Sequence, residues 1–126
     1  MTRTPAQYGP APRRVDKPWG YELIWAQTGV YVGKLLSVDA GHSLSLQYHE
    51  RKDESWFVQS GRARLELGEL EGTMTTIEIA GGDAFHFPPR TVHRVTALED
   101  TLILEVSTPE LDDVVRLEDR YGRAEA

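Results

Sequence analysis

The sequence predicts an all-β domain, an antiparallel barrel or sandwich, on three observations. Short segments rich in β-branched and aromatic residues follow one another from residue 20 to residue 106, separated by Gly, Pro and Asp. Two of these segments, 62–67 and 76–79, alternate strictly between polar and apolar side chains, as strands with one solvated face do. Helical periodicity is almost absent across the same region. Short strands at this spacing are typical of antiparallel barrels and sandwiches.

Nine segments are expected to be strands, with turns at the glycine-containing steps between them. They are 20–25, 30–38, 44–49, 55–59, 63–67, 73–79, 84–87, 92–97 and 102–106. Residues 1–16 contain three prolines and no periodicity, so we expect an extended or frayed arm before a single domain over 17–126. Residues 111–121 place apolar side chains near one stripe, which predicts a short C-terminal helix.

Composition and charge restrict the classes of function. The 126 residues fit one domain, and the absence of cysteine excludes disulfides and thiolate metal sites. A net charge of −6 with scattered basic residues argues against a nucleic-acid partner. No run approaches the roughly 20 apolar residues of a membrane span, and the N-terminus lacks the apolar region of a signal peptide. We therefore expect a cytoplasmic protein with no membrane partner.

Four polar side chains are candidates for a metal site. Gln47 and His49 are two residues apart, which places both on one face of a strand. Glu54 follows after a turn, and His93 lies near the start of a later strand; alternate positions of neighbouring barrel strands converge on the interior. This mixed set suits zinc, which we favour, or manganese, iron, nickel or cobalt, better than calcium or magnesium. On spacing alone, the alternative is that these histidines are ordinary buried core residues.

The spacing of these four residues resembles the two motifs of the cupin superfamily. The first motif, Gly-x5-His-x-His-x(3–4)-Glu-x6-Gly, is matched by Gly41-x5-Gln47-x-His49-x4-Glu54-x6-Gly61, with Gln for the first His. The second, Gly-x5-Pro-x-Gly-x2-His, is matched by Gly82-x5-Pro88-x-Arg90-x2-His93, with Arg for the second Gly. Ala97 stands where the second motif ends in Asn. The resemblance implies a small jelly-roll-like barrel that binds a divalent metal through Gln47, His49, Glu54 and His93.

A narrower resemblance joins the chain to the cupin of type II mannose-6-phosphate isomerases. It is carried by residues 17–20, 45–49, 54–56, 88–94 and 115–123. In many proteins that cupin follows a mannose-1-phosphate guanylyltransferase domain; no such domain precedes the cupin-like residues here, so guanylyl transfer is not expected. Gln replaces the first cupin His in those relatives as well. Lys52 stands where the family usually has Arg, and Ser55 where it has His.

The resemblance implies an aldose–ketose isomerase acting on a sugar phosphate. Its metal would polarise the O1 and O2 oxygens while a side chain carries a proton between C1 and C2. Glu105 is the expected base if it faces the barrel interior, and an outward orientation is the alternative. Cationic side chains are candidates for the phosphate, because Arg and Lys both suit that dianion. They are Arg94, which adjoins His93, together with Lys34, Lys52 and Arg116.

Two other functions stay open beside the isomerase. The metal set could hold iron in a small-molecule dioxygenase, and the changes at Lys52 and Ser55 fit a non-catalytic cupin that binds a sugar or another ligand. We also expect a homodimer, because pairing hides the open edge strands of a small barrel. The proline-rich arm and Trp19 are the expected contact residues.

Overall fold

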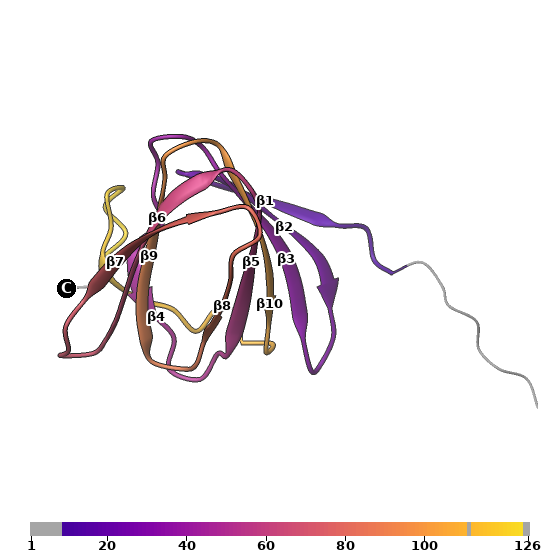
Figure 1. Ribbon diagram of the computed structural model, residues 1–126. Helices are drawn as coiled ribbons and strands as arrows, with labels where there is room; N and C mark the ends of the chain where they lie inside the picture. The colour runs from indigo at the N-terminus through magenta and orange to yellow at the C-terminus, as the bar shows by residue number, and fades with distance from the viewer. Residues whose placement is uncertain (1–8, 111, 125–126) are drawn as a thin grey trace, which may run out of the picture.

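The computed structural model describes residues 9–110 and 112–124, which form two antiparallel sheets closed into a barrel-like fold (Figure 1). The first sheet has the order β1 (Arg13–Lys17), β2 (Gly20–Gln27), β3 (Val32–Val38), β10 (Thr101–Ser107), β5 (Glu54–Ser60) and β8 (Ala84–Phe87). The second has the order β11 (Val115–Glu118), β4 (Leu46–Tyr48), β9 (Thr91–Ala97), β6 (Arg62–Glu69) and β7 (Thr75–Ala80). The all-β prediction is confirmed, and the nine predicted strands correspond to β2 through β10.

The predicted C-terminal helix is wrong. The described residues contain no helix, and therefore none that could span a membrane; residue 111 lies outside the described part of the chain. Val115 and Arg116 instead pair with Tyr48 and Gln47, so that β11 extends the second sheet beyond β4. The edge of β4, although distant in sequence, provides hydrogen-bond partners for the backbone of residues 115–118. An isolated helix as short as 111–121 would be only marginally stable.

At the other end of the chain, the expected arm also contains structure. Residues 1–8 lie outside the described range, but Arg13–Lys17 forms β1. This strand pairs antiparallel with β2, with Arg13 opposite Ile24 and Lys17 opposite Gly20. The chain therefore enters the barrel as the edge strand of the first sheet.

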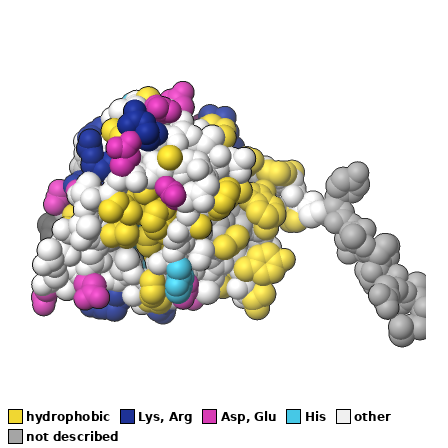
Figure 2. Space-filling model, in the orientation of Figure 1, with side chains coloured by type: hydrophobic (Ala, Val, Ile, Leu, Met, Phe, Trp, Pro, Cys, Tyr) yellow, Lys and Arg dark blue, Asp and Glu magenta, His cyan; other side chains and the backbone are white. Residues whose placement is uncertain are grey.

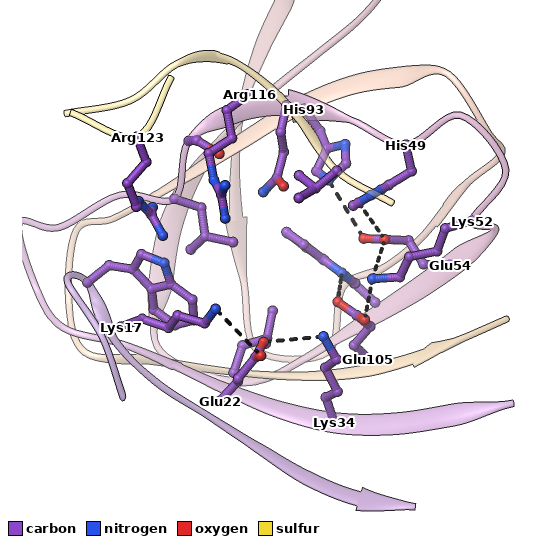
Figure 3. A pocket seen from close by; sticks show the side chains of 17 residues that line it. Lys17, Glu22, Lys34, His49, Lys52, Glu54, His93, Glu105, Arg116 and Arg123 are labelled. Carbon is purple, nitrogen blue, oxygen red and sulfur yellow. Dashed lines mark hydrogen bonds and ion pairs between the residues drawn. The ribbon is translucent and has the colours of Figure 1, made fainter. Parts of the chain in front are cut away.

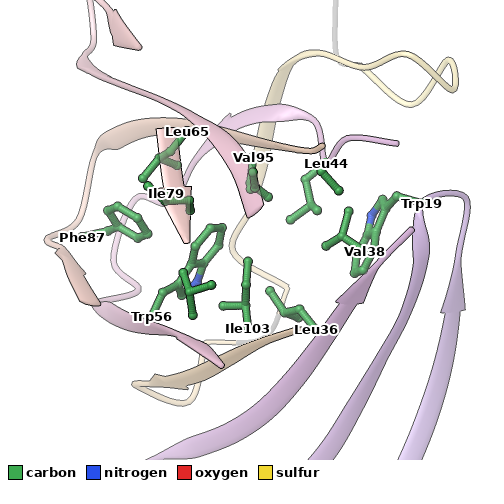
Figure 4. Close-up of a cluster of buried hydrophobic side chains, with 13 residues drawn as sticks. Trp19, Leu36, Val38, Leu44, Trp56, Leu65, Ile79, Phe87, Val95 and Ile103 are labelled. Atoms are coloured by element: carbon green, nitrogen blue, oxygen red, sulfur yellow. The ribbon is translucent and has the colours of Figure 1, made fainter. Parts of the chain in front are cut away.

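The hydrophobic core fills the space between the two sheets (Figure 4). Leu36, Trp56 and Ile103 come from the first sheet, and Leu65 and Val95 from the second. All five side chains are buried, and they hold β5, β9 and β10 together. Trp19 is also part of this core and is only 4% exposed, so it is not available as the contact residue that the sequence suggested.

The inward side of the barrel changes from apolar to polar along the same strands. On β5, Glu54, Trp56 and Val58 are all buried, and on β10 Ile103 and Glu105 are buried. Side chains two residues apart on a strand share a face, so these carboxylates point into the barrel beside the core. A buried carboxylate is costly unless it is paired, which makes this end of the barrel the place to search for a site.

Two turns next to these strands have backbone conformations with positive φ. Gly61 joins β5 to β6 with φ 93°, and an added Cβ would lie 2.3 Å from the carbonyl oxygen of Asp100. Arg90 has φ 70° at the position where the cupin motif has Gly, a conformation that costs a non-glycine residue about 1–2 kcal/mol. Its backbone N–H donates to the carbonyl of His49 at 2.7 Å. That hydrogen bond ties this strained turn to the loop that follows β4.

Candidate metal centre

The structure brings His49, Glu54 and His93 together, with one potential ligand atom from each lying within 4.8 Å of the others. Nε2 of His49 lies 3.1 Å from Oε2 of Glu54, and Nε2 of His93 lies 3.6 Å from Oε1 (Figure 3). Glu54 begins β5, His93 is the third residue of β9, and His49 directly follows β4. One strand of each sheet and the residue that follows β4 therefore contribute to one group.

Backbone carbonyls orient both imidazole rings. Nδ1 of His49 is hydrogen-bonded to the carbonyl oxygen of Asp113, and Nδ1 of His93 to that of Thr91 at 3.0 Å. A carbonyl only accepts hydrogen bonds, so each Nδ1 carries a proton, and Nε2 is the ring nitrogen that faces Glu54. This arrangement, with the outer nitrogen donating to a backbone carbonyl, is typical of metal-binding histidines.

The surroundings of the two Nε2 atoms test whether these residues fit a metal ion. A nitrogen lone pair facing a carboxylate oxygen is repulsive unless a proton or a cation lies between them. Nε2 of His93 is buried without a hydrogen-bond partner among the described residues. Burial, only partly offset by the charge of Glu54, lowers the pKa of His93 and keeps its ring neutral. A cation satisfies both rings and the carboxylate, so the group fits a metal ion.

The charges around this group also favour a cation. Nζ of Lys52 lies 3.2 Å from Oε2 of Glu54 and 3.0 Å from Oε2 of Glu105. Burial opposes ionisation of Glu54, but the contact with His49 and the charge of Lys52 lower its pKa to about 2. Burial likewise acts to lower the pKa of Lys52, and the two carboxylates raise it well above its ordinary value. One ammonium thus faces two carboxylates, which leaves negative charge to balance a metal ion.

Gln47 lies next to these residues on β4. It is paired in register with His93 of β9, and its side chain lines the same cavity. An amide oxygen at this position is the ligand that the cupin resemblance implies. That role for Gln47 stays a prediction.

Glu105 faces the interior of the barrel and not the solvent. Its side chain is buried at 4% exposure, and Oε1 accepts a hydrogen bond from Nε1 of Trp56 at 3.2 Å. Across the sheet it stands opposite Lys34 of β3 and Trp56 of β5. Lys52 bridges it to Glu54, so the expected base lies beside the candidate metal ligands.

The cavity has a cationic wall: Lys17 and Arg123 lie on the side away from His49 and Lys52, while Lys34 lies nearer to Glu105 and Arg116 nearer to His93 (Figure 3). Four cationic side chains line this part of the cavity: Lys17, Lys34, Arg116 and Arg123. Glu22 lies among them, 3.3 Å from Nζ of Lys34 and 3.8 Å from Nζ of Lys17. The guanidinium of Arg123 is held by Asp119 at 2.9 Å. Positive charge exceeds negative charge on this wall.

Arg116 differs from the other three cations because it makes no ion pair with any residue in the described ranges. It lies on β11 directly opposite Gln47, which places it at the part of the cationic wall next to the candidate ligands. Its guanidinium is therefore the cavity cation most available to an anion.

The structure does not bring Arg94 into this cavity. It follows His93 on β9, and adjacent strand residues point to opposite faces. Its guanidinium is bound to Glu66 at 2.6 Å and lies 3.4 Å from Glu118. The other predicted cations, Lys34, Lys52 and Arg116, do line the cavity.

Lys17 and Arg123 line the cavity but were not among the predicted site residues. Both lie in segments that carry the family resemblance, 17–20 and 115–123. That resemblance was the available signal, because neither residue is close in sequence to the candidate ligands.

A two-sheet antiparallel barrel with a His/Glu/His group on its inner wall defines this protein as a cupin with a candidate metal centre. Within the cupins, the chain belongs to the family described as mannose-6-phosphate isomerase C-terminal, whose model matches residues 8–119.

Curated relatives agree with this assignment. The chain is 34% identical over 118 residues to the mannose-1-phosphate guanylyltransferase ManC of Salmonella typhimurium, covering 88% of this chain and 23% of that protein. It is 33% identical over 117 residues to the xanthan biosynthesis protein XanB of Xanthomonas campestris, covering 88% and 24%. The chain thus spans about a quarter of the length of these relatives.

Solved structures place the fold among the cupins. KdgF from Halomonas sp. superposes with a TM-score of 0.68 at 28% identity, covering 79% of this chain and 90% of that one. Oxalate decarboxylase from Bacillus subtilis superposes with a TM-score of 0.75 at 18% identity, covering 85% and 30%. At the latter identity the similarity concerns the fold alone.

Proposed function

We propose that this protein is a metal-dependent aldose–ketose isomerase that interconverts mannose 6-phosphate and fructose 6-phosphate. Family membership supports the reaction class. The observation that carries the proposal is the position of Glu105, which is bridged by Lys52 to Glu54 and stands opposite Lys34 of the cationic wall. A base in this position reaches a sugar whose oxygens lie at the candidate metal centre and whose phosphate lies at the wall.

His49, Glu54 and His93, with Gln47 as the fourth residue, are proposed to hold the ion. Zinc is our proposal because it prefers imidazole and carboxylate ligands, and manganese, iron, nickel and cobalt suit the same set. The chemistry that a divalent ion supplies in such a site is polarisation of the sugar oxygens next to the reacting carbons.

Glu105 is proposed to move the proton. A proton leaves C2 of the aldose, is held by the carboxylate and returns at C1, while the hydroxyl proton of O2 moves to O1; C2 becomes the carbonyl carbon and no proton is consumed overall. Oε1 is fixed by Trp56, whereas Oε2 is buried with no aligned hydrogen bond among the described residues. Oε2 is therefore the oxygen proposed to carry the proton, with Lys52 supplying the compensating charge 3.0 Å away.

The phosphate is proposed to bind at the cationic wall, and first of all to Arg116. A chain with a net charge of −6 repels a dianion at long range. Salt screens that repulsion over about 10 Å at 0.1 M, whereas a guanidinium in direct contact is screened much less. The guanidinium of Arg116, which has no ion-pair partner within residues 9–110 and 112–124, can donate two hydrogen bonds to one phosphate, which a lysine cannot do in the same geometry.

A coupled assay with metal-reconstituted protein tests the proposal. We expect fructose 6-phosphate to form from mannose 6-phosphate, a chelator to stop the reaction, and added zinc to restore it. Free mannose should not react, because it lacks the group that the wall binds. If mannose 6-phosphate raises the melting temperature without turnover, the non-catalytic alternative is correct. Oxygen consumption by the iron-loaded protein would favour the dioxygenase.

A further inference from the structure

Lys34 is a buried cation inside the cavity, in contrast to the Lys and Arg side chains that Figure 2 shows on the molecular surface. The residue is 7% exposed, and its Nζ donates a hydrogen bond to Oε2 of Glu22 at 3.3 Å. Lysine is rarely buried in this way, because the ammonium loses its hydration unless charged or polar partners replace it. Lys17 and Arg123 supply positive charge to the same cavity from partly exposed positions. A share in the charge of the wall therefore does not explain why Lys34 is buried.

Lys34 flanks the proposed base on the side away from the candidate metal ligands. It lies on β3 in register with Glu105 of β10, and both side chains line the cavity. Residues in register on neighbouring strands have Cβ atoms about 5 Å apart, so the two side chains are neighbours. On the other side of Glu105, Nζ of Lys52 lies between that carboxylate and Glu54. Figure 3 shows the ammonium of Lys34 between Glu105 and Glu22.

The bonding order of a cyclic sugar phosphate matches this order of side chains. In the ring of mannose 6-phosphate, O5 joins C1 to C5, and C5 carries the phosphorylated C6. A sugar with C1 and C2 at Glu105 and its phosphate at the cationic wall therefore has O5 on the side of C1 that faces the wall. Lys34 adjoins Glu105 and, through Glu22, Lys17 of the wall. Its ammonium is thus placed to donate a proton at O5.

The proposed isomerisation by Glu105 requires that such a ring first opens. The proton on C2 is acidic only when C1 is a carbonyl carbon, and C1 becomes one when the bond between C1 and O5 breaks. Ring opening needs a general acid at O5 and a base for the proton of the O1 hydroxyl. Because Glu105 is assigned to the proton bound to carbon, a separate side chain is needed for this step.

We propose that this protein also interconverts the α and β anomers of its sugar phosphate, with Lys34 as the catalytic residue that opens and closes the ring. The identity of the sugar rests on the proposed function, but the opening step does not use Glu105. Lys34 donates a proton to O5 as the C1–O5 bond breaks, and the resulting amine takes the proton of the O1 hydroxyl as the C1 carbonyl forms. O1 and O5 are bonded to the same carbon, so one Nζ reaches both oxygens and the ammonium is restored.

The open aldose has two fates in this site. It closes to the other anomer after rotation about the C1–C2 bond, or it loses its C2 proton in the proposed isomerisation. Ring opening and closing leave every hydrogen on carbon in place. Exchange between the anomers without uptake of deuterium at C2 is therefore the signature of the step assigned to Lys34.

Exchange NMR of mannose 6-phosphate with the metal-loaded full chain tests the proposal, because it resolves the C1 signals of the two anomers. We expect the wild-type protein to accelerate their exchange above the rate in buffer. Lys34→Arg keeps the positive charge, but a guanidinium does not release its proton in proteins. This variant should lower the catalysed exchange at saturating substrate about 10²- to 10⁴-fold, the usual contribution of a positioned acid. Binding of mannose 6-phosphate, read from the shift of melting temperature, should change little.

The control is Arg94→Ala, which removes a cation outside the cavity that is bound to Glu66 and should keep the wild-type exchange rate. If the larger guanidinium of Lys34→Arg prevents folding, Lys34→Met takes its place, again measured at saturating substrate.

Two results would overturn the proposal. The wild-type protein could leave anomer exchange at the rate in buffer, or Lys34→Arg could exchange at the wild-type rate, which would show that Lys34 supplies only charge. Formation of fructose 6-phosphate is measured separately in the same samples. Catalysed anomer exchange without fructose 6-phosphate would support the role of Lys34 and contradict the proposed isomerase. Fructose 6-phosphate without catalysed anomer exchange would do the opposite.

Discussion

His49 and Asp113, 64 residues apart in sequence, are joined by the hydrogen bond between the imidazole Nδ1 and the backbone carbonyl. The Asp113 carboxylate also accepts hydrogen bonds from the backbone N–H groups of Glu50, Arg51 and Lys52, at 3.1, 2.6 and 3.0 Å. Burial acts to raise the pKa of this carboxyl, but the three amide donors lower it below its ordinary value. Asp113 therefore orients one candidate ligand and holds the turn that leads to Lys52.

This arrangement predicts that Asp113→Ala weakens metal binding. Without the carboxylate, the turn at residues 50–52 loses three hydrogen bonds and the backbone carbonyl loses its fixed position. Loss of such supporting contacts typically lowers metal affinity ten- to a hundred-fold. Calorimetric titration of zinc into metal-free protein measures the effect. Asp112→Ala is the control, because Asp112 is the exposed neighbour in the same segment. Equal affinity in the Asp113 variant and the wild type would contradict the positioning role.

The candidate ligands themselves give a second prediction. His49→Ala and His93→Ala should each purify with much less metal than the wild type, as measured by elemental analysis. Both should stay folded, because the core extends across both sheets; melting of His93→Ala should fall further than that of His49→Ala, since the His93 ring is buried and stacks on Phe87 at a centroid distance of 4.8 Å. His86→Ala is the control, since His86 is exposed and paired with Asp53 at 2.8 Å. Unchanged metal content in both ligand variants would show that the assignment is wrong.

Arg116 and Arg94 form a matched pair for testing the phosphate site. Arg116→Ala should weaken binding of mannose 6-phosphate about ten- to a hundred-fold, because a hydrogen bond to a charged group contributes about 1.5–3 kcal/mol. Arg94→Ala should change it little, since Arg94 binds Glu66 outside the cavity. The shift of melting temperature with ligand concentration measures both. A larger loss from Arg94→Ala than from Arg116→Ala would refute the assignment of the anion to the cationic wall.

The proposed base gives a fourth prediction. Glu105→Gln should reduce turnover by about 10²- to 10⁴-fold, the usual contribution of a positioned proton carrier. Binding of the sugar phosphate should change little, because the amide oxygen can still accept the hydrogen bond from Trp56. Exchange of the C1 and C2 hydrogens with D₂O, followed by NMR, reports the proton transfer directly.

Glu22→Gln is the contrasting variant for Glu105. Glu22 is another cavity carboxylate, but it pairs with Lys17 and Lys34 on the cationic wall. Its replacement should alter KM more than kcat, because it changes the charge near the phosphate and leaves the proton carrier in place. If Glu105→Gln retains wild-type exchange, the base must be another residue.

Part of the site could be read from local spacing. The alternation of neighbouring side chains placed Gln47 and His49 on one face, and the same rule excludes Arg94, because it adjoins the inward-facing His93. Sequence proximity to a ligand suggested Arg94, whereas strand geometry sends it to the opposite surface. The two-residue alternation of side chains along a strand was therefore a better guide to the position of Arg94 than its proximity to His93 in the sequence.

The C-terminal segment shows where local pattern is insufficient. Apolar residues in 111–121 occur at spacings compatible with a helix, and 115–118 equally reads as a short strand. The edge of β4, almost 70 residues earlier in the chain, supplies the pairing partner. That contact puts Asp113 beside His49 and Arg116 opposite Gln47, so a long-range pairing completes the site.

The sequence alone was sufficient for the nine strands β2 to β10, for the cupin family, and for the group of His49, Glu54 and His93, because each depends on spacing within the chain. The orientation of Glu105 required the tertiary structure. Its strand has apolar residues on both sides, so alternation between apolar and polar residues could not tell the inner face from the outer one. The packing of β10 between β3 and β5 turns Ile103 and Glu105 inward and leaves Leu104 on the outward side of the sheet. Strand periodicity is local, but which side faces the core depends on strands that are distant in sequence.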